Sequence, residues 1–132
     1  MKYLVLLLIT VLVSSCSVLD YPKRVVGYSV ESFKQEKKGR FSFDVGLSFK
    51  KAYNKCNLFL FENNIQTNFK SSKKGYIVAS KFSIFYEYTL DSTEVAFFIS
   101  EIDKNNSKIE VISNNSRLAK FVYNKLVIYM NK

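Results

Sequence analysis

The chain has 132 residues, which allows one domain or a short appendage followed by one domain. Its hydrophobic fraction of 48% and aromatic fraction of 16% are enough to build a core, so wholesale disorder is excluded. It contains no histidine, and 20 Lys and Arg against 11 Asp and Glu give a formal charge of +9. Without histidine, Ser-His-Asp or Cys-His catalysis, a histidine-ligated zinc and a histidine general base are all excluded.

Residues 1–15 have the layout of an export signal. Lys2 gives a positively charged start, and an apolar run of 11 residues extends from Tyr3 to Val13. A helix that spans a hydrocarbon core of about 30 Å needs about 20 residues, so this run is a signal-peptide core and not a stable membrane helix. The pattern predicts export from the cytoplasm.

The sequence Val13-Ser14-Ser15-Cys16 places an aliphatic residue and two small residues directly before a cysteine. This motif resembles the lipobox of bacterial lipoproteins. The resemblance implies that the Cys16 thiol carries a diacylglycerol, that a signal peptidase cuts between Ser15 and Cys16, and that Cys16 becomes the first residue of the mature chain. The alternatives are an ordinary signal peptide with a coincidental cysteine and an uncleaved anchor.

The same resemblance implies a location in the bacterial cell envelope, attached to a membrane through the lipid. In families with two membranes an aspartate after the cysteine favours the inner one, and here Ser17 favours the outer membrane. Each buried methylene contributes about 0.8 kcal/mol, so two or three acyl chains anchor stably where one chain would be marginal. Removal of residues 1–15 leaves 19 Lys and Arg against 11 acids, a charge of +8.

Cys56 is the second of two cysteines. If Cys16 carries the lipid, Cys56 has no partner for an intramolecular disulfide. Cys56 is then either a reactive or intermolecularly paired thiol, or a small buried hydrophobic residue on a helix. The helical pattern around it favours the buried residue.

Residues 16–39 are polar and basic, with the only proline at Pro22 and a charge-rich run at 34–40. We interpret 16–39 as the lipidated N-terminus and a basic tether, which holds a single domain of residues 40–132 off the membrane. For the second part of this segment, an edge strand near 28–33 is the alternative.

A strand and a helix are predicted at the start of the domain. Residues 41–45 alternate between apolar and polar, the period of a half-buried strand. Apolar residues then recur at helical spacing, with polar residues on the opposite face. This apolar stripe consists of Phe49, Ala52, Tyr53, Cys56, Phe59 and Leu60. Asp44 or Ser48 can cap the start of the helix, and the asparagines at 63–64 can end it.

Four more strands and a second helix follow. The strands are predicted from their apolar alternation at 65–70, at 76–89 with a bend near Ser80, around 95–99, and from Ile109 onward. Asparagines before Ser116 offer a cap for a C-terminal helix. The apolar face of this helix consists of Leu118, Phe121, Val122, Leu126, Tyr129 and Met130.

These elements predict an α+β fold in one small domain, with the order β-α-β-β-β-β-α. This order predicts a mostly antiparallel sheet with both helices packed on one face. The predicted core packs the first helix against the sheet. It consists of Phe49, Tyr53, Cys56 and Leu60 on the helix and Val78, Phe82, Phe97 and Ile99 opposite them.

Five lysines form a candidate surface for an anionic partner. They are Lys50, Lys51, Lys55, Lys73 and Lys74, on the first helix and the following turn. Near a charged surface such residues contribute roughly 1 kcal/mol each, so anionic headgroups or the phosphates of an envelope polysaccharide would fit them. The alternative is a solvated, lysine-rich surface without a partner.

Four carboxylates flank one predicted hairpin: Asp91, Glu94, Glu101 and Asp103. Paired carboxylates can do acid–base chemistry or bind calcium. Their spacing matches no calcium loop, and they alternate around hydrophobic strand residues. We therefore interpret them as solvated charges and expect no metal.

Lys74-Gly75-Tyr76 opens like the aromatic motif of an RNA-recognition sheet. Ile77, Val78 and Lys81 stand where that motif needs a small residue and two stacking aromatics. We therefore expect no nucleic acid partner, and interpret the three residues as a turn lysine followed by a core-facing tyrosine.

No nucleotide-binding loop, metal cluster or nucleophile elbow is found in the sequence. We therefore expect no enzymatic activity and no cofactor, but a lipid-anchored envelope lipoprotein that acts as a structural or protein-interaction module. The alternative is a binder of a small ligand or of an anionic lipid or polysaccharide headgroup, and an enzyme based on carboxylates or tyrosines is the third class. An uncovered apolar sheet face would favour the first, an enclosed apolar cavity the second, and converging carboxylates the third.

Overall fold

A computed structural model describes residues 30–132 of the chain. The predicted signal peptide, the predicted lipidation site at Cys16 and the expected tether up to residue 29 lie outside the described residues. In chain order the elements are β1 (Arg40–Val45), α3 (Phe49–Glu62), β2 (Gln66–Ser71), β3 (Tyr76–Ser80), the 3₁₀ helix η1 (Phe82–Ile84), β4 (Val95–Glu101), β5 (Ser107–Ile112) and α4 (Ser116–Met130).

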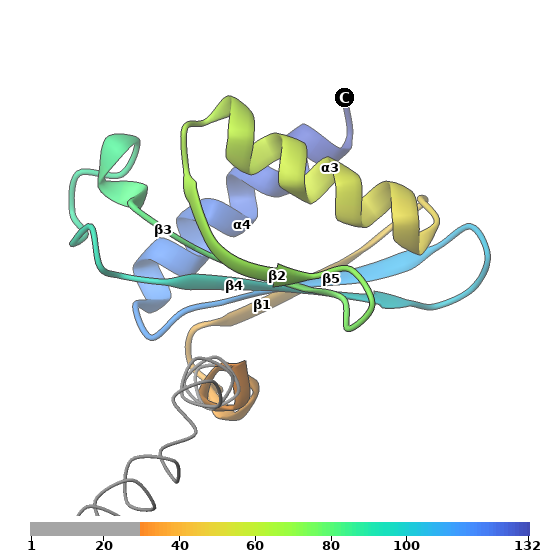
Figure 1. Ribbon diagram of the computed structural model, residues 1–132, viewed down its shortest axis with the longest axis horizontal. Coiled ribbons are helices and arrows are strands. Elements are labelled where there is room, and N and C mark those ends of the chain that lie inside the picture. The colour runs from red at the N-terminus through yellow and green to blue at the C-terminus, as the bar shows by residue number, and fades with distance from the viewer. Residues whose placement is uncertain (1–29) are drawn as a thin grey trace, which may run out of the picture.

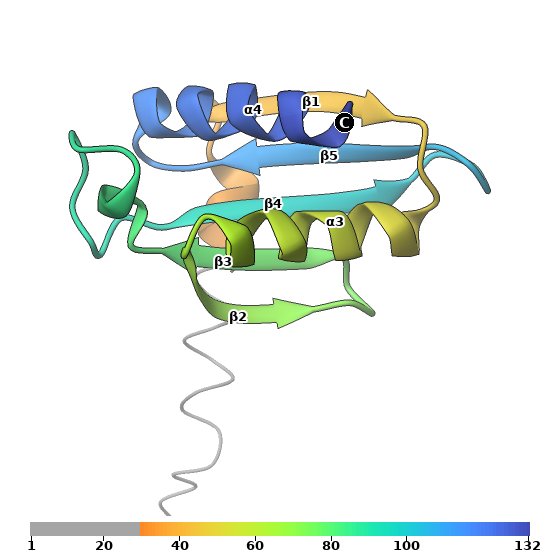
Figure 2. The same cartoon turned by 90° about the horizontal axis from the view of Figure 1, so that it is seen from above.

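The five strands of the described chain form one antiparallel sheet in the order β1-β5-β4-β3-β2. Both α3 and α4 lie across the same face of this sheet (Figure 1, Figure 2). The predicted α+β fold, its element order and the placement of both helices on one face are therefore confirmed. We call the face under α3 and α4 the helix face and the opposite one the second face.

Asparagines delimit the two helices. The Asn115 side chain accepts a hydrogen bond from the Leu118 backbone N–H at 3.1 Å and so caps the start of α4. At the end of α3, the Asn63 side chain donates to a carbonyl one turn earlier, and Asn64 adopts a left-handed φ of 56°. Ser48 precedes α3 as expected but makes no side-chain capping bond.

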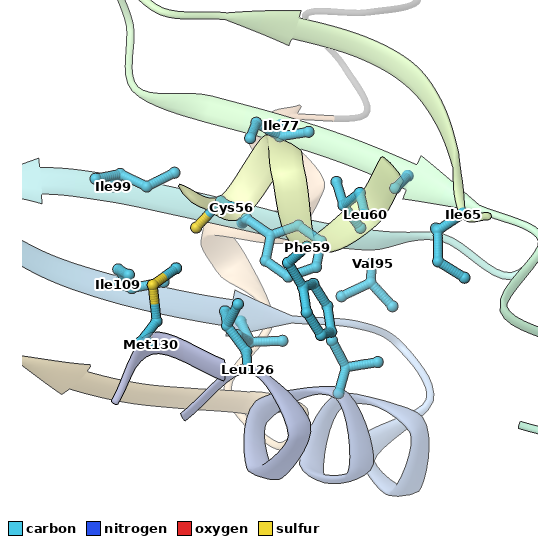
Figure 3. Packing of buried hydrophobic residues seen from close by; sticks show 14 of the residues in the cluster. Cys56, Phe59, Leu60, Ile65, Ile77, Val95, Ile99, Ile109, Leu126 and Met130 are labelled. Atoms are coloured by element: carbon cyan, nitrogen blue, oxygen red, sulfur yellow. The ribbon is translucent and has the colours of Figure 1, made fainter. Parts of the chain in front are cut away.

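One apolar cluster fills the space between the helix face and the two helices (Figure 3). Cys56 and Leu60 on α3 are at most 1% exposed, and Phe82 and Phe97 opposite them are fully buried. Tyr53 and Ile99 belong to the same cluster, and Phe49 packs at its margin. The predicted core is therefore confirmed for these residues, except that Phe49 is only partly buried.

Val78 is the exception, because it is buried on the second face and not under α3. Its neighbour Ile77 faces the helices, paired in register with Phe97. Both positions are apolar, so the alternation does not say which of the two belongs to the helix face. The prediction for Val78 was wrong for that reason.

The long strand predicted over 76–89 is also wrong beyond its first residues, since β3 ends at Ser80. Lys81 adopts a left-handed φ of 64°, and the chain turns there into η1. The partner strand β4 pairs only with residues 76–79, so a longer β3 would leave its backbone groups without a ladder. The alternation after residue 81 therefore does not mark a strand.

The second face is covered by a segment that the sequence reading assigned to the tether. Residues 30–35 are helical and lie beneath the sheet (Figure 1). Val30 and Phe33 are 8% and 4% exposed, and they pack against residues of β3, β4 and β5. These sheet residues are Val78, Ala96 and Ile112. We call residues 30–39 the strap.

The strap corrects two expectations. Residues 30–33 are helical, so the alternative edge strand near 28–33 is wrong over this part. The strap also packs onto the domain, so the boundary expected at residue 40 falls too late. Only two apolar residues, three apart, mark the strap, and the charged residues around them gave it the composition of a linker.

Arg40 ties the strap to the sheet. Its guanidinium donates to the carbonyls of Phe33 and Lys34 near the C-terminal end of the strap helix, at 3.3 and 2.5 Å, and to the carbonyl of Glu36 just after the helix, at 3.1 Å. The same guanidinium pairs with the Glu110 carboxylate on β5 at 3.2 Å. A cation at a helix C-terminus is favourable because it complements the unpaired carbonyls and the helix dipole.

The turn between the strap and β1 needs a glycine. A Cβ on Gly39 would lie 1.8 Å from the Ser113 carbonyl oxygen, and the Gly39 carbonyl accepts the Ser113 N–H at 3.0 Å. The Glu36 carboxylate accepts the backbone N–H groups of Lys38 and Gly39, and the first of these bonds is the main cause that lowers the Glu36 pKa. Two contacts therefore fix the turn. The backbone of Gly39 lies close to that of Ser113, and the ionised Glu36 carboxylate accepts the N–H groups of the turn.

Two adjacent residues of α3 test the assignment of the core. Leu60→Ala should reduce the free energy of unfolding by about 2–5 kcal/mol, because Leu60 is 1% exposed in a closely packed cluster. Phe61→Ala removes a larger side chain that is 78% exposed, and should change stability by less than about 0.5 kcal/mol. Chemical denaturation measures both, and an equal loss in the two variants would contradict the assignment.

Candidate functional site

Four of the five predicted surface lysines gather at one end of the sheet. Lys50 and Lys51 are exposed in the first turn of α3, and Lys73 and Lys74 are exposed in the turn between β2 and β3. Both views place these two segments at the same end of the molecule (Figure 1, Figure 2). The structure adds Lys104, in the turn between β4 and β5. We call Lys50, Lys51, Lys73, Lys74 and Lys104 the lysine end.

Close backbone contacts hold these segments together. Gly75, which follows Lys74, has a φ of +68°, and its carbonyl accepts the Ile99 N–H of β4 at 2.7 Å. A Cβ on Gly75 would lie 2.2 Å from the Ile99 carbonyl oxygen and 3.1 Å from the Phe49 ring, at the start of α3. The hairpin turn and the start of α3 are therefore in contact.

The lysine end carries a net positive charge, because its five lysines outnumber the acids at the same end, which are Asp44, Glu101 and Asp103. The first turn of α3 carries no acid, so its unpaired N–H groups and the two lysines have the same sign. Asp103 is the acid of the nearby β4–β5 turn, and its carboxylate accepts two hydrogen bonds from the Asn106 amide and the N–H groups of residues 105 and 106. The Asn106 side-chain bond is the main cause that lowers the Asp103 pKa. This carboxylate is thus engaged within its own turn.

Lys55, the fifth predicted lysine, has a structural role. Its ammonium donates to the Met130 carbonyl at 3.0 Å, at the C-terminal end of α4, and lies 6.0 Å from the centre of the Tyr129 ring. A lysine at a helix C-terminus is favourable for the same reason as Arg40 in the strap. Lys55 therefore joins α3 to α4 instead of belonging to the lysine end.

An open groove of about 520 Å³ lies between α3 and β2. Leu58 and Phe61 on its α3 wall are 48% and 78% exposed, and Lys70 donates to Asn57 across it at 3.2 Å. Residues 54, 65 and 67 complete the lining. This groove is open to solvent and has polar as well as apolar side chains in its lining, so it is not the enclosed apolar cavity that would favour a small-ligand binder.

The four carboxylates singled out in the sequence do not converge. Asp91 and Glu94 lie before β4, and Glu101 and Asp103 lie at its far end. Asp91 accepts the Ser83 hydroxyl, and Glu94 accepts the Asn68 amide at 2.7 Å. Within residues 30–132, no group of three or more carboxylates and cysteines is placed to hold a metal ion.

Two other expectations concern single residues. Tyr76 is the aromatic residue of the tripeptide that resembles an RNA-recognition motif. It lies on the second face with its ring centre 6.4 Å from that of Phe98, and it is half-buried against a small apolar cluster. Cys56 is fully buried, and burial raises the pKa of its thiol to about 12. The structure thus supports the interpretation of Cys56 as a buried hydrophobic residue.

Lys104 and the exposed connection between β3 and β4 are the features that sequence reasoning missed. Lys104 lies in a predicted turn whose position beside the hairpin depends on tertiary contacts. The connection was interpreted as a strand, although Ile84, Tyr88 and Leu90 are 60%, 83% and 73% exposed there. Their alternation was genuine, but it did not correspond to two faces of a sheet.

The comparisons with known proteins add no assignment. No protein-family model matches the chain, and no curated protein matches it. None of the helices in the described part of the chain is long and apolar enough to cross a membrane. The functional argument therefore rests on the sequence and the geometry.

The environment of Cys56 predicts its reactivity. With a thiol pKa of about 12, roughly one molecule in ten thousand carries the thiolate at pH 8, and the side chain is fully buried. A disulfide reagent should therefore leave Cys56 unmodified in the folded protein and modify it within minutes in denaturant. Mass spectrometry of the labelled peptide distinguishes the two, and rapid modification of the folded chain would contradict the structure.

Proposed function

We propose that this protein is a lipid-anchored lipoprotein of a bacterial envelope that acts as a non-catalytic interaction module. The lysine end binds the partner, whose surface is anionic. The observation that carries the proposal is that lysines from separate segments gather at one end of a basic domain, away from the strap through which the chain reaches the domain.

The strap supports this arrangement. Phe33 of the strap borders a small depression together with Ser92, Thr93, Glu94 and Asn114, which lie at the end of the sheet opposite to the lysine end (Figure 2). A chain anchored at Cys16 reaches the domain near that end. The lysine end is then directed away from the anchor and is accessible to a partner.

Exposed lysines suit such a role better than catalysis. Exposed charges interact over about 8 Å at physiological ionic strength, which favours fast, salt-sensitive association with a charged surface. The alternative partner is an anionic lipid or polysaccharide headgroup, which satisfies the same lysines. Competition separates these two partners. A free phosphorylated sugar should displace this protein from a lipid or polysaccharide headgroup, but should leave its complex with a protein partner intact.

The anchor is tested by intact mass. The membrane form should lack residues 1–15 and carry the mass of two or three acyl chains on Cys16. Cys16→Ser should abolish both the cleavage and the membrane retention, since it removes the acceptor thiol. Unchanged processing and retention in this variant would contradict the lipoprotein assignment.

The lysine end is tested with heparin as a polyanionic probe. Replacing Lys50, Lys51, Lys73 and Lys74 by Ser should lower the salt concentration that elutes the detergent-solubilised protein from a heparin column. The matched control replaces four exposed lysines elsewhere: Lys34, Lys37, Lys38 and Lys120. Both variants lose the same charge, so elution of both at the same salt concentration would show that net charge alone binds the probe.

A further inference from the structure

We infer that the connection between β3 and β4, residues 81–94, is a second membrane contact that places Ile84, Tyr88 and Leu90 in the interface of the lipid bilayer. This inference rests on the proposed lipid anchor. The inference adds an orientation to the anchor: the β3–β4 connection touches the membrane, and the lysine end points away from the membrane.

The first observation is the exposure of the connection. Ile84, Tyr88 and Leu90 are 60%, 83% and 73% exposed, within a stretch of seven residues. Three large exposed apolar side chains in one short segment point to a contact surface, whereas single exposed ones are ordinary. The group is therefore a candidate contact with an apolar phase.

The second observation is that the base of the connection is fixed. The Lys81 N–H donates to the Asp91 carbonyl at 2.9 Å, and the Ser83 hydroxyl donates to the Asp91 carboxylate. Phe82 is fully buried in the main core, and the Tyr86 ring lies 4.6 Å from that of Phe121 on α4. This fixed base holds the connection at this end of the domain.

The third observation is where the connection lies. The connection forms one extremity of the molecule in both views, and the lysine end forms the other (Figure 1, Figure 2). The strap reaches the same end as the connection, since Phe33 borders residues 92–94. Residues 16–29 separate the lipid from the strap, and a stretch of 14 residues spans at most about 50 Å, so the anchor permits this contact.

The chemistry of the group fits a lipid interface. Aliphatic side chains beside a tyrosine hydroxyl match the boundary between headgroups and acyl chains, where tyrosine is enriched. The charged residues of the connection are Lys81, Glu87, Asp91 and Glu94, which carry a net charge of −2. This end therefore suits zwitterionic lipid, and the lysine end suits an anionic partner.

The test uses tryptophan as a depth reporter, because the chain has none. The full lipidated protein carrying Tyr88→Trp is reconstituted in phosphatidylcholine vesicles with brominated acyl chains. The matched control is Ile102→Trp, which is 52% exposed in the β4–β5 turn of the lysine end. Tryptophan emission at position 88 should fall roughly twofold with brominated lipid, and emission at position 102 should be unchanged.

The quenching results distinguish the membrane contact from the anchor. Quenching at position 88 alone supports the inference. Vesicle-bound protein with no quenching at position 88, or with equal quenching at both positions, overturns it and leaves the anchor intact. Protein that does not stay with the vesicles contradicts the proposed anchor instead. A blue shift of the tryptophan emission at position 88 that increases with protein concentration and does not depend on lipid bromination would show that a second copy of the chain covers this position. That result also overturns the inferred membrane contact. If Tyr88→Trp does not fold, Leu90→Trp replaces it.

Discussion

The fold depends on one constraint: the central strands of its sheet are apolar on both faces, so both faces must be removed from water. Each of β3, β4 and β5 places two fully buried apolar residues next to each other, which point to opposite sides. These pairs are Ile77 and Val78, Ala96 and Phe97, and Val111 and Ile112. Two helices supply one cover, and the second cover comes from the chain that leads into the domain, with burial worth roughly 25 cal/mol per Å² on each side.

This second cover fixes where the chain enters the domain. Arg40 bonds to the carbonyls of the strap helix and to Glu110 on β5, so the strap is held by polar contacts and by the burial of Phe33. The point where the proposed anchor segment reaches the domain is therefore fixed relative to the sheet. The lysine turns and the exposed β3–β4 connection lie at opposite ends, so the proposed anchor, the membrane contact and the partner surface follow one axis.

The sequence was sufficient to predict elements whose apolar residues share one face. The stripes of α3 and α4 each bury one side, and their spacing predicted both helices and the core beneath them. The sequence was not sufficient where adjacent apolar residues are buried on opposite faces of the sheet, or where an apolar alternation lies outside any strand. Ile77 and Val78 are both buried, so alternation could not assign their faces, and the even spacing after Lys81 resembled a strand although no neighbouring strand was available to pair with it.

The candidate site shows the same division. Lys50 and Lys73 were predicted from local charge density, but Lys104 joins them only through the contacts between turns, which the sequence does not display. Lys55 was misjudged because its partner, the Met130 carbonyl, lies 75 residues further along the chain. The strap was read as a linker because two apolar residues among charges carry little periodicity, although they are enough to cover three positions of the sheet.

Hydrogen exchange of the lipidated protein in detergent micelles tests most directly whether the strap belongs to the fold. If it does, the backbone amides of Glu36, Lys38 and Gly39 should exchange at least about a hundredfold more slowly than in an unstructured peptide, because each is hydrogen-bonded within the packed strap. Exchange of these amides at the unstructured rate, while β5 stays protected, would contradict the account.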